Sequence, residues 1–370
     1  MLSLSKLFFF TALLFSIQAF SQSAFQKSVN ISLETGPLIS NGTEWGDELK
    51  DLVKYRGIDI QMGWRKNENT LYNYLYRYPT FGIGLNAGTT QTQEIGKPIA
   101  LYGFVDLPFS IPSQSRKIHF GYFSQLGLGF NLNPYDVTKN PENQYIGSSI
   151  NCFIHLGLYS KIHLSERVDL KANIGLKHYS NGSTKKPNSG INLAPIGLGV
   201  NVKLGDLVSI PTAKPDFSDY PKKFFWNFAL YTGIKNYEIG APSYFRGGFG
   251  VNYLIQPGPK YRLGIGMDLF WAQGMEQRFS GSQFSFRDQT SLAVVGSWEW
   301  QLSDRLYIPI GLGVYLFRNE VNQEWTSYYE RIGVRYRMNQ HLFAGVQIKA
   351  HKAKADFFEF TFGYTLPSSN

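Results

Sequence analysis

The chain has 370 residues, of which 36 are basic and 27 are acidic, so it carries a net charge of +9. Its single cysteine, Cys152, excludes an intramolecular disulfide framework and any cysteine-based metal cluster. The 37 glycines, 29 phenylalanines and 23 tyrosines favour β structure, and no stretch beyond residue 21 is long and apolar enough to predict a membrane-spanning helix. The basic balance suits an anionic partner, either nucleic acid or an anionic lipid headgroup.

The first 21 residues have the pattern of a secretory signal peptide. Lys6 is followed by an apolar run over 7–15, and Ala19 and Ser21 place small residues at the −3 and −1 positions of a cleavage site. We expect cleavage after Ser21, with a short N-terminal membrane anchor as the alternative. Loss of Lys6 leaves 35 basic and 27 acidic residues, a net charge of +8. Export makes lipid, and not nucleic acid, the expected anionic partner.

The mature chain alternates apolar residues with polar residues or glycine in segments of about ten residues, as strands of membrane barrels do. This period of two predicts β-strands. The sixteen predicted strands are 27–37, 55–65, 79–89, 98–107, 117–132, 147–162, 166–180, 191–204, 224–235, 244–256, 260–274, 289–302, 305–318, 328–338, 341–351 and 355–366.

The predicted strand 117–132 shows which face points outward. One face is continuously aliphatic and aromatic, whereas the other consists of glycine and polar residues. Soluble sandwiches expose a charged face, so the apolar face here suits lipid and the other face suits a barrel interior. Closure of the sheet gives every backbone N–H and C=O a partner inside hydrocarbon. We therefore predict an all-β, antiparallel outer-membrane barrel. The aromatic segment 356–366 is similar to the terminal strand of bacterial outer-membrane barrels.

The lengths of the connections agree with this topology, because periplasmic turns are short and outer loops are longer. The short turns are 164–167, 302–305 and 339–340, and the longer outer loops are 38–54, 133–146, 181–190 and 319–327. Residues 65–78 form an inner connection that is longer than this rule predicts, and the sequence offers no reason for its length.

An internal repeat divides the chain into two halves. Residues 164–180 align without gaps on 302–318, and the second copy has Leu316 in place of His178 and Arg318 in place of Ser180. The predicted division is a signal peptide (1–21), an eight-stranded half that holds the candidate site (22–206), a Pro-containing connector (207–223) and a second eight-stranded half without the site (224–370). Inward glycines favour two small barrels, and one sixteen-stranded barrel is the alternative.

A candidate hydrolytic site lies at the end of the predicted strand 166–180. His178 and Ser180 complete the face that elsewhere carries Leu170, Ile174 and Leu176, and Asn192 enters the next strand in the same phase. A serine hydroxyl needs a base to take its proton, and the histidine needs a third group to fix its tautomer. Residues i and i+2 of a strand lie about 6 to 7 Å apart, so rotamers or coiling at the strand end must bring the two side chains together.

The loop after Ser180 contains the candidate oxyanion donors, Asn181 and Asn188. A His-x-Ser pair alone is most often interfacial decoration, and Asn192 could equally be a strand-start asparagine that bonds its own backbone. His119 and His155 are expected to pack inside the barrel, and Cys152 is expected to act as a small hydrophobe. The pattern contains no metal-ligand cluster and no phosphate-binding loop, so we predict no metal and no other cofactor.

Together, His178-x-Ser180-Asn181-Gly182 and Pro187-Asn188-x-Gly190-Ile191 resemble the signature of the PagL-type lipid A 3-O-deacylases, also described as acyloxyacyl hydrolases. The resemblance covers about residues 26–205. It implies an outer-membrane barrel in which Ser180 is the nucleophile, His178 the base and Asn188 an oxyanion donor. The family has glutamate where this chain has Asn192, so Asn192 would orient His178 without a negative charge. A carboxylate from an outer loop, such as Glu142, is the alternative.

The resemblance implies hydrolysis of an ester-linked acyl chain of lipid A in lipopolysaccharide, without a metal, at a site on the lipid-facing wall. Two other functions stay open. One is a catalytically silent structural or pore-forming barrel, which a wide charged lumen would favour. The other is an esterase that acts on phospholipid, which needs the same catalytic residues and differs only in its substrate.

Overall fold

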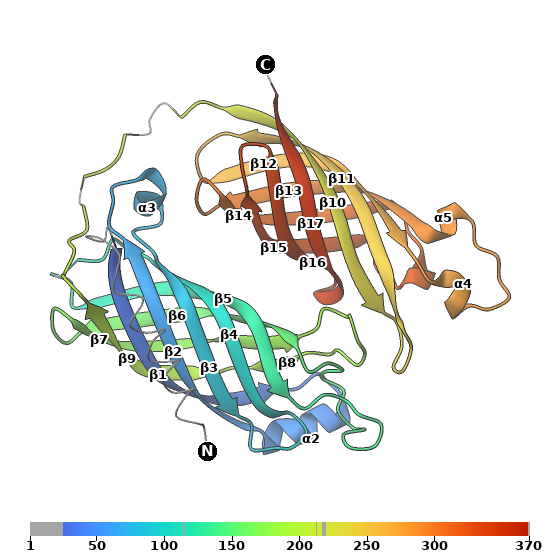
Figure 1. Cartoon of the computed structure of the whole chain (residues 1–370), viewed down its shortest axis with the longest axis horizontal. Helices are drawn as coiled ribbons and strands as arrows, with labels where there is room; N and C mark the ends of the chain where they lie inside the picture. The colour runs from blue at the N-terminus through green and yellow to red at the C-terminus, as the bar shows by residue number, and fades with distance from the viewer. Residues whose placement is uncertain (1–24, 114, 212, 217–219, 369–370) are drawn as a thin grey trace, which may run out of the picture.

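The computed structural model describes residues 25–113, 115–211, 213–216 and 220–368, so the predicted signal peptide, residues 1–21, lies outside the described residues. The chain forms two closed antiparallel β-barrels that lie side by side (Figure 1). The prediction of an all-β barrel protein is confirmed, and the two halves close separately instead of forming one sixteen-stranded barrel.

The first barrel is an antiparallel meander, and its first strand closes on its last. Its strands are β1 (Phe25–Ile39), β2 (Lys54–Lys66), β3 (Thr80–Thr89), β4 (Gly96–Pro108), β5 (Ile118–Leu132), β6 (Asn151–His163), β7 (Val168–Ser180), β8 (Ile191–Leu193) and β9 (Ile196–Leu204). The predicted strand 191–204 is thus interrupted at Ala194 and Pro195, where proline has no N–H to give to a ladder. The pairing with β7 continues in the same register on both sides of the break, so β8 and β9 act as one strand.

The second barrel has the same meander topology, with β10 closing on β17. Its strands are β10 (Lys223–Asn236), β11 (Ser243–Gln256), β12 (Tyr261–Ala272), β13 (Thr290–Gln301), β14 (Leu306–Phe317), β15 (Tyr328–Arg337), β16 (Leu342–His351) and β17 (Lys354–Ser368). Short helices occupy connections: α2 (Glu44–Leu52), α3 (Leu71–Leu75), α4 (Met275–Arg278), α5 (Phe286–Gln289) and the 3-10 turn η2 (Glu320–Asn322). Within the described ranges, every helix is too short or too polar to cross a bilayer.

The two faces of β7 follow the predicted alternation. Ile174 and Leu176 point outward and are 57% and 60% exposed, whereas Lys171 and Lys177 on the other face are buried. Exposed aliphatic side chains recur on the outer face of the neighbouring strand, as in Leu198 of β9. The outer wall is therefore suited to hydrocarbon, and the charged residues lie inside.

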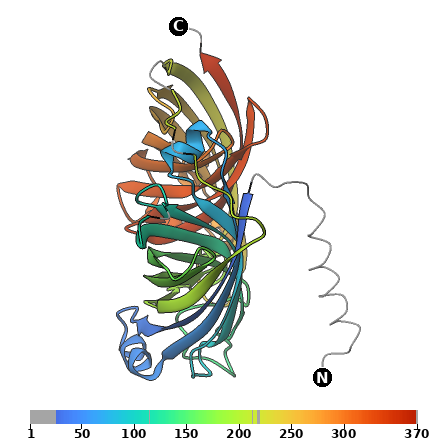
Figure 2. The same cartoon turned by 90° about the vertical axis from the view of Figure 1, so that its left-hand side faces the viewer.

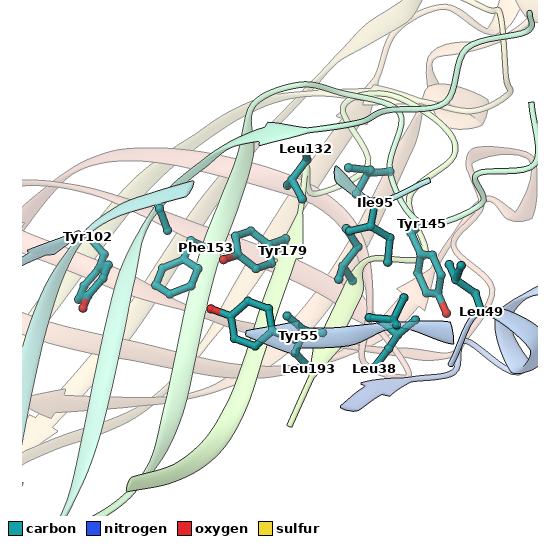
Figure 3. Close-up of a cluster of buried hydrophobic side chains, with 14 of the residues drawn as sticks. Leu38, Leu49, Tyr55, Ile95, Tyr102, Leu132, Tyr145, Phe153, Tyr179 and Leu193 are labelled. Carbon is teal, nitrogen blue, oxygen red and sulfur yellow. The ribbon is translucent and has the colours of Figure 1, made fainter. Parts of the chain in front are cut away.

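Side chains fill both barrel interiors. At the end of the first barrel where β1 finishes, aromatic and aliphatic side chains form a buried cluster (Figure 3), which includes Tyr55, Phe153 and Tyr179. Ion pairs fill the remainder, such as Lys177 with Glu34 in the first barrel and Arg331 with Asp268 and Glu359 in the second. Two small cavities inside the barrels have volumes of about 60 and about 20 Å³. These interiors make rigid scaffolds for the outer walls.

The internal repeat corresponds to a shared turn followed by a strand. In the first copy the Leu164 N–H donates to the Val168 carbonyl at 2.9 Å, and in the second the Leu302 N–H donates to the Leu306 carbonyl at 2.9 Å. The aligned strands are β7 and β14, which are the seventh strand of one barrel and the fifth of the other. The counterpart of β7 by position is therefore β16.

The barrels contact each other at both ends (Figures 1 and 2). At the end where β1 begins, which we call the inner end, the Tyr72 hydroxyl of the α3 segment donates to the Pro259 carbonyl at 3.2 Å. Tyr76 in the same segment donates to the Gln301 carbonyl. This docking accounts for the unexpected length of the connection 65–78. At the opposite, outer end, the Asn236 N–H donates to the Ser183 carbonyl at 2.8 Å.

Candidate active site

The candidate residues lie at the outer end of the β7–β8 hairpin. His178 and Ser180 are on the outward face of β7, and Asn192 is the direct cross-strand partner of His178. Ser180 is buried, and His178 and Asn192 are half-buried. The ladder therefore fixes all three residues on one face, immediately beyond the exposed Leu176.

The three side chains form a continuous chain of hydrogen bonds. The Nε2 atom of His178 lies 2.8 Å from the Ser180 Oγ, and the Nδ1 atom lies 2.7 Å from the Asn192 Oδ1. An amide oxygen only accepts, so Nδ1 carries the proton and Nε2 is free to accept the serine hydroxyl hydrogen. This is the tautomer that a histidine base requires. The His178 and Ser180 side chains meet across the i, i+2 spacing of β7, of which Ser180 is the last residue.

The loop between β7 and β8 is held by both predicted asparagines. The Asn188 Oδ1 accepts from the Asn181 N–H at 2.9 Å. The Asn181 side-chain amide donates to the Ser148 Oγ at 2.9 Å and to the Lys185 carbonyl at 2.7 Å. The amide nitrogen of Asn188 has no hydrogen-bond partner among the residues that the structure describes. Asn181 thus holds the loop, and Asn188 places an unused donor beside the residue that follows Ser180.

Gly190 allows the imidazole to occupy its position. Its φ is +77°, and a Cβ atom added there would lie 2.5 Å from the His178 Cε1. Its N–H donates to the Tyr145 carbonyl at 2.9 Å, which ties the end of the loop to the preceding outer loop. The sequence motif contains this glycine but does not predict its contact with the histidine, because that contact depends on how the loop folds back over β7.

Cys152 is the direct cross-strand partner of Ser180, on β6. It is half-buried on the outward face and forms no disulfide. The period of two places Cys152 and Ser180 on the same kind of face, but only the register of β6 against β7 brings them together. We assign Cys152 no chemical role, yet its position makes it a neighbour of the candidate nucleophile.

The carboxylate proposed as an alternative partner for His178 does not reach it. Glu142 is exposed, and no hydrogen bond or ion pair joins it to His178 in the described part of the chain. Asn192 accepts the Nδ1 hydrogen bond instead. Among the described residues, no group of three or more His, Cys, Asp or Glu side chains is arranged to hold a metal ion.

The second barrel also reaches the candidate site. A Cβ added at Gly182, whose φ is +60°, would lie 2.1 Å from the Phe358 Cδ2 of β17. Beside it, the Ser183 Oγ donates to the Ala355 carbonyl at 2.9 Å. This contact was not predictable from the sequence, because no local pattern determines which face of one barrel meets the other.

Family comparisons match both halves of the chain. Residues 42–201 match the family described as lipid A 3-O-deacylase (PagL), and residues 224–368 match the family described as acyloxyacyl hydrolase, C-terminal domain. Together the two matches cover most of the chain and leave the connector between them. No curated protein sequence matches the chain.

The solved structures that match the chain share little sequence identity with it, and their TM-scores are low. OccAB4 of Acinetobacter baumannii has 9% identity and a TM-score of 0.24 over 94% of this chain and 99% of its own. OccK2 (OpdF) of Pseudomonas aeruginosa, in complex with glucuronate, has 8% identity and a TM-score of 0.21 over 93% and 96%. The COG4313 outer membrane channel of Pseudomonas putida F1 has 10% identity and a TM-score of 0.21 over 95% and 98%.

Proposed function

The chain belongs to the lipid A 3-O-deacylase (PagL) family of outer-membrane ester hydrolases, and on this basis we propose that Ser180 removes an ester-linked acyl chain from lipid A with His178 as its base. The observation that carries the proposal is the hydrogen-bonded chain from Ser180 through His178 to Asn192. It stands on the outer wall of a barrel, where the acyl chains of a membrane lipid lie.

The first half-reaction forms an acyl-enzyme. His178 Nε2 takes the hydroxyl proton as the Ser180 Oγ attacks the ester carbonyl carbon. The tetrahedral intermediate then collapses, the bond to the sugar oxygen breaks, and His178 returns the proton to that oxygen. In the second half-reaction a water replaces the sugar oxygen, transfers its proton to His178 and releases a fatty acid. Ser180 regains its proton from His178.

Asn188 is the better of the two predicted oxyanion donors. Its Oδ1 is anchored on the Asn181 N–H, so its amide group is held next to the backbone of Ser180. The Asn181 amide already donates to Ser148 and Lys185, which supports a role in holding the loop. Donors fixed before the reaction stabilise a developing oxyanion without reorganisation.

Asn192 is proposed to orient His178. Its Oδ1 accepts the hydrogen bond from the His178 Nδ1, which lies 2.7 Å away, and its own amide donates to the Gly190 carbonyl at 3.5 Å. An amide fixes the tautomer but does not stabilise the imidazolium by charge, as a carboxylate does. We infer that the enzyme works with a slower proton-transfer step than a relative with glutamate at this position.

We propose that residues 22–206 form the catalytic half and that residues 224–370, after the connector 207–223, form a half without its own site. The position in the second barrel that corresponds to Ser180 supports this division. Counted from the equivalent turns, in which the Leu164 and Met338 N–H groups donate to the Val168 and Leu342 carbonyls, that position is residue 354. It lies beyond the end of β16 at His351 and is a lysine, not a serine.

The packed interiors argue against a pore, which would need an open lumen. An esterase that hydrolyses phospholipid would use the same residues, so only the substrate distinguishes it from a lipid A deacylase. Mass spectrometry of lipid A from cells that produce the wild type or Ser180→Ala tests the proposal. Loss of one acyl chain only with the wild type supports it. Formation of lysophospholipid with intact lipid A would instead identify phospholipid as the substrate.

A further inference from the structure

A cavity of about 280 Å³ lies where the outer ends of the two barrels meet. The first barrel contributes Ser183 and Lys186 from the loop that follows Ser180. The second barrel contributes Lys352 and Lys354 from the β16–β17 turn, with Trp325 from the loop before β15. Neither barrel alone encloses this space.

The cavity carries an excess of positive charge. Its one carboxylate, Asp356, is already paired with Lys235 and with Lys349, the latter at 2.9 Å. Lys186, Lys352 and Lys354 form no salt bridge within the described part of the chain. Burial lowers the pKa of Lys186, and the nearby charge of Lys354 acts in the same direction, whereas Asp356 opposes both. Like charges held together without a counter-ion are unfavourable, so the cluster is suited to an anion.

The β16–β17 turn presents its lysine at a structural cost. Lys352 and Ala353 have φ values of +51° and +60°, a conformation that two-residue hairpin turns require and that asparagine and glycine adopt most easily. A non-glycine residue in this region is under backbone strain. A long cationic side chain therefore stands where the turn itself favours a small residue. Lys354 follows at the start of β17, so both cations point from the same turn toward the cavity lining.

The cavity is coupled to the candidate catalytic residues through the loop they share. Ser183 is three residues from Ser180, a chain distance of at most about 10 Å. The Ser183 Oγ donates to the Ala355 carbonyl, and the Lys186 N–H donates to the Asn236 Oδ1 at 3.1 Å. An anionic group bound in the cavity would thus lie close to an ester that reaches Ser180. The outward face of β7 supplies an apolar wall for the acyl chains.

We propose that this cavity is a binding subsite for a phosphate group on the headgroup of the acylated glycolipid, and that the second barrel supplies Lys352 and Lys354 to it. The proposal rests on the proposed function for the identity of the lipid. It assigns the second barrel a part in substrate binding. Phosphate accepts several charge-assisted hydrogen bonds at once, which matches ammonium groups converging from two barrels.

The test measures binding and does not require turnover. Ser180→Ala protein is titrated with phosphorylated lipid A and with the same lipid A after phosphatase treatment. The fluorescence of Trp325 at the cavity reports occupancy. The double variant Ser180→Ala/Trp325→Phe identifies the part of the signal that comes from Trp325. The subsite predicts that the phosphorylated lipid binds about tenfold more tightly, as expected for the loss of charge-assisted hydrogen bonds. Adding Lys352→Ala and Lys354→Ala should remove that preference.

The control pair is Lys97→Ala with Lys139→Ala, which removes two exposed outer-end lysines that do not line the cavity. This pair should keep the preference. Inorganic phosphate should compete with the phosphorylated lipid only at far higher concentration if the lipid headgroup is the ligand, and equal potency would identify free phosphate as the ligand instead. Equal binding of both lipids by the Ser180→Ala protein, or an unchanged preference without the two turn lysines, would overturn the subsite. Absence of lipid hydrolysis by the wild type would overturn the proposed function. The binding results would not be affected, because they do not require turnover.

Discussion

Asn192 lies directly across the β7–β8 ladder from His178 and accepts its Nδ1 hydrogen bond at 2.7 Å. The acceptor that fixes the imidazole is therefore neutral. A carboxylate of the same shape would keep the hydrogen bond and add an attractive charge to the imidazolium that forms during the reaction. This difference is open to a direct test.

Asn192→Asp is expected to raise kcat for lipid A deacylation by about tenfold, because a carboxylate stabilises the protonated histidine in the transition state. Asn192→Leu, of similar size, is expected to lower kcat at least about a hundredfold because it no longer fixes the tautomer. Both variants are assayed in detergent with purified lipid A. Wild-type activity in the leucine variant would contradict the positioning role of Asn192.

Gly190→Ala should displace the imidazole of His178. The added Cβ would lie 2.5 Å from the His178 Cε1, so the ring must rotate away from Ser180. We expect at least about a hundredfold loss of kcat, the scale of losing a general base. Gly205→Ala is the matched control, since its φ of +70° imposes similar backbone strain with no atom near the added Cβ. Equal activity in the two variants would show that Gly190 acts only on the backbone.

A bulky group on Cys152 should block the site. Cys152 pairs across the ladder with Ser180 and lies on the same outward face. Treatment with a large maleimide is expected to reduce deacylation at least about tenfold, because the substrate ester must approach Ser180 along this wall. Cys152→Ser should be fully active and insensitive to the reagent. Labelled protein that retains its activity would mean that the acyl chain reaches Ser180 from another direction.

Phe358 of the second barrel is expected to support the active-site loop. It lies against Gly182, two residues after Ser180, so Phe358→Ala removes the surface on which the loop rests. We predict a several-fold loss of kcat with a folded barrel, since small displacements of a catalytic group are costly. Phe360→Ala is the control, because Phe360 points outward from the same strand and is 61% exposed. Equal effects of the two changes would argue for a general loss of barrel stability.

The strands and their faces were predictable from the sequence because one alternating pattern determines both. Each of the sixteen predicted segments contains a strand, and the lipid face of β7 is the predicted one. The break at Pro195 was not predicted, although proline there removes a ladder donor. The docking of α3 and the contact of Phe358 with Gly182 depend on how two closed surfaces meet, which no periodicity encodes.

The proximity of the candidate site residues was predictable from the sequence, whereas their catalytic role stays a prediction. Phase alone placed His178, Ser180 and Asn192 on one face, and the structure brings their side chains within hydrogen-bond distance. The different hydrogen bonds of Asn181 and Asn188 could not be predicted from the motif, because they depend on which loop atoms each amide reaches. The cavity between the barrels combines residues more than 160 positions apart, so it appears only in three dimensions.

Mass spectrometry of lipid A from cells that produce the wild type, Ser180→Ala or His178→Ala decides whether this protein is a deacylase that uses these two residues. We predict that lipid A loses the mass of one ester-linked acyl chain with the wild type and keeps it with either variant. Heat-modifiable migration of all three proteins would establish that the barrels are folded. Unchanged lipid A in all three samples, with folded barrels, would contradict the proposed deacylase.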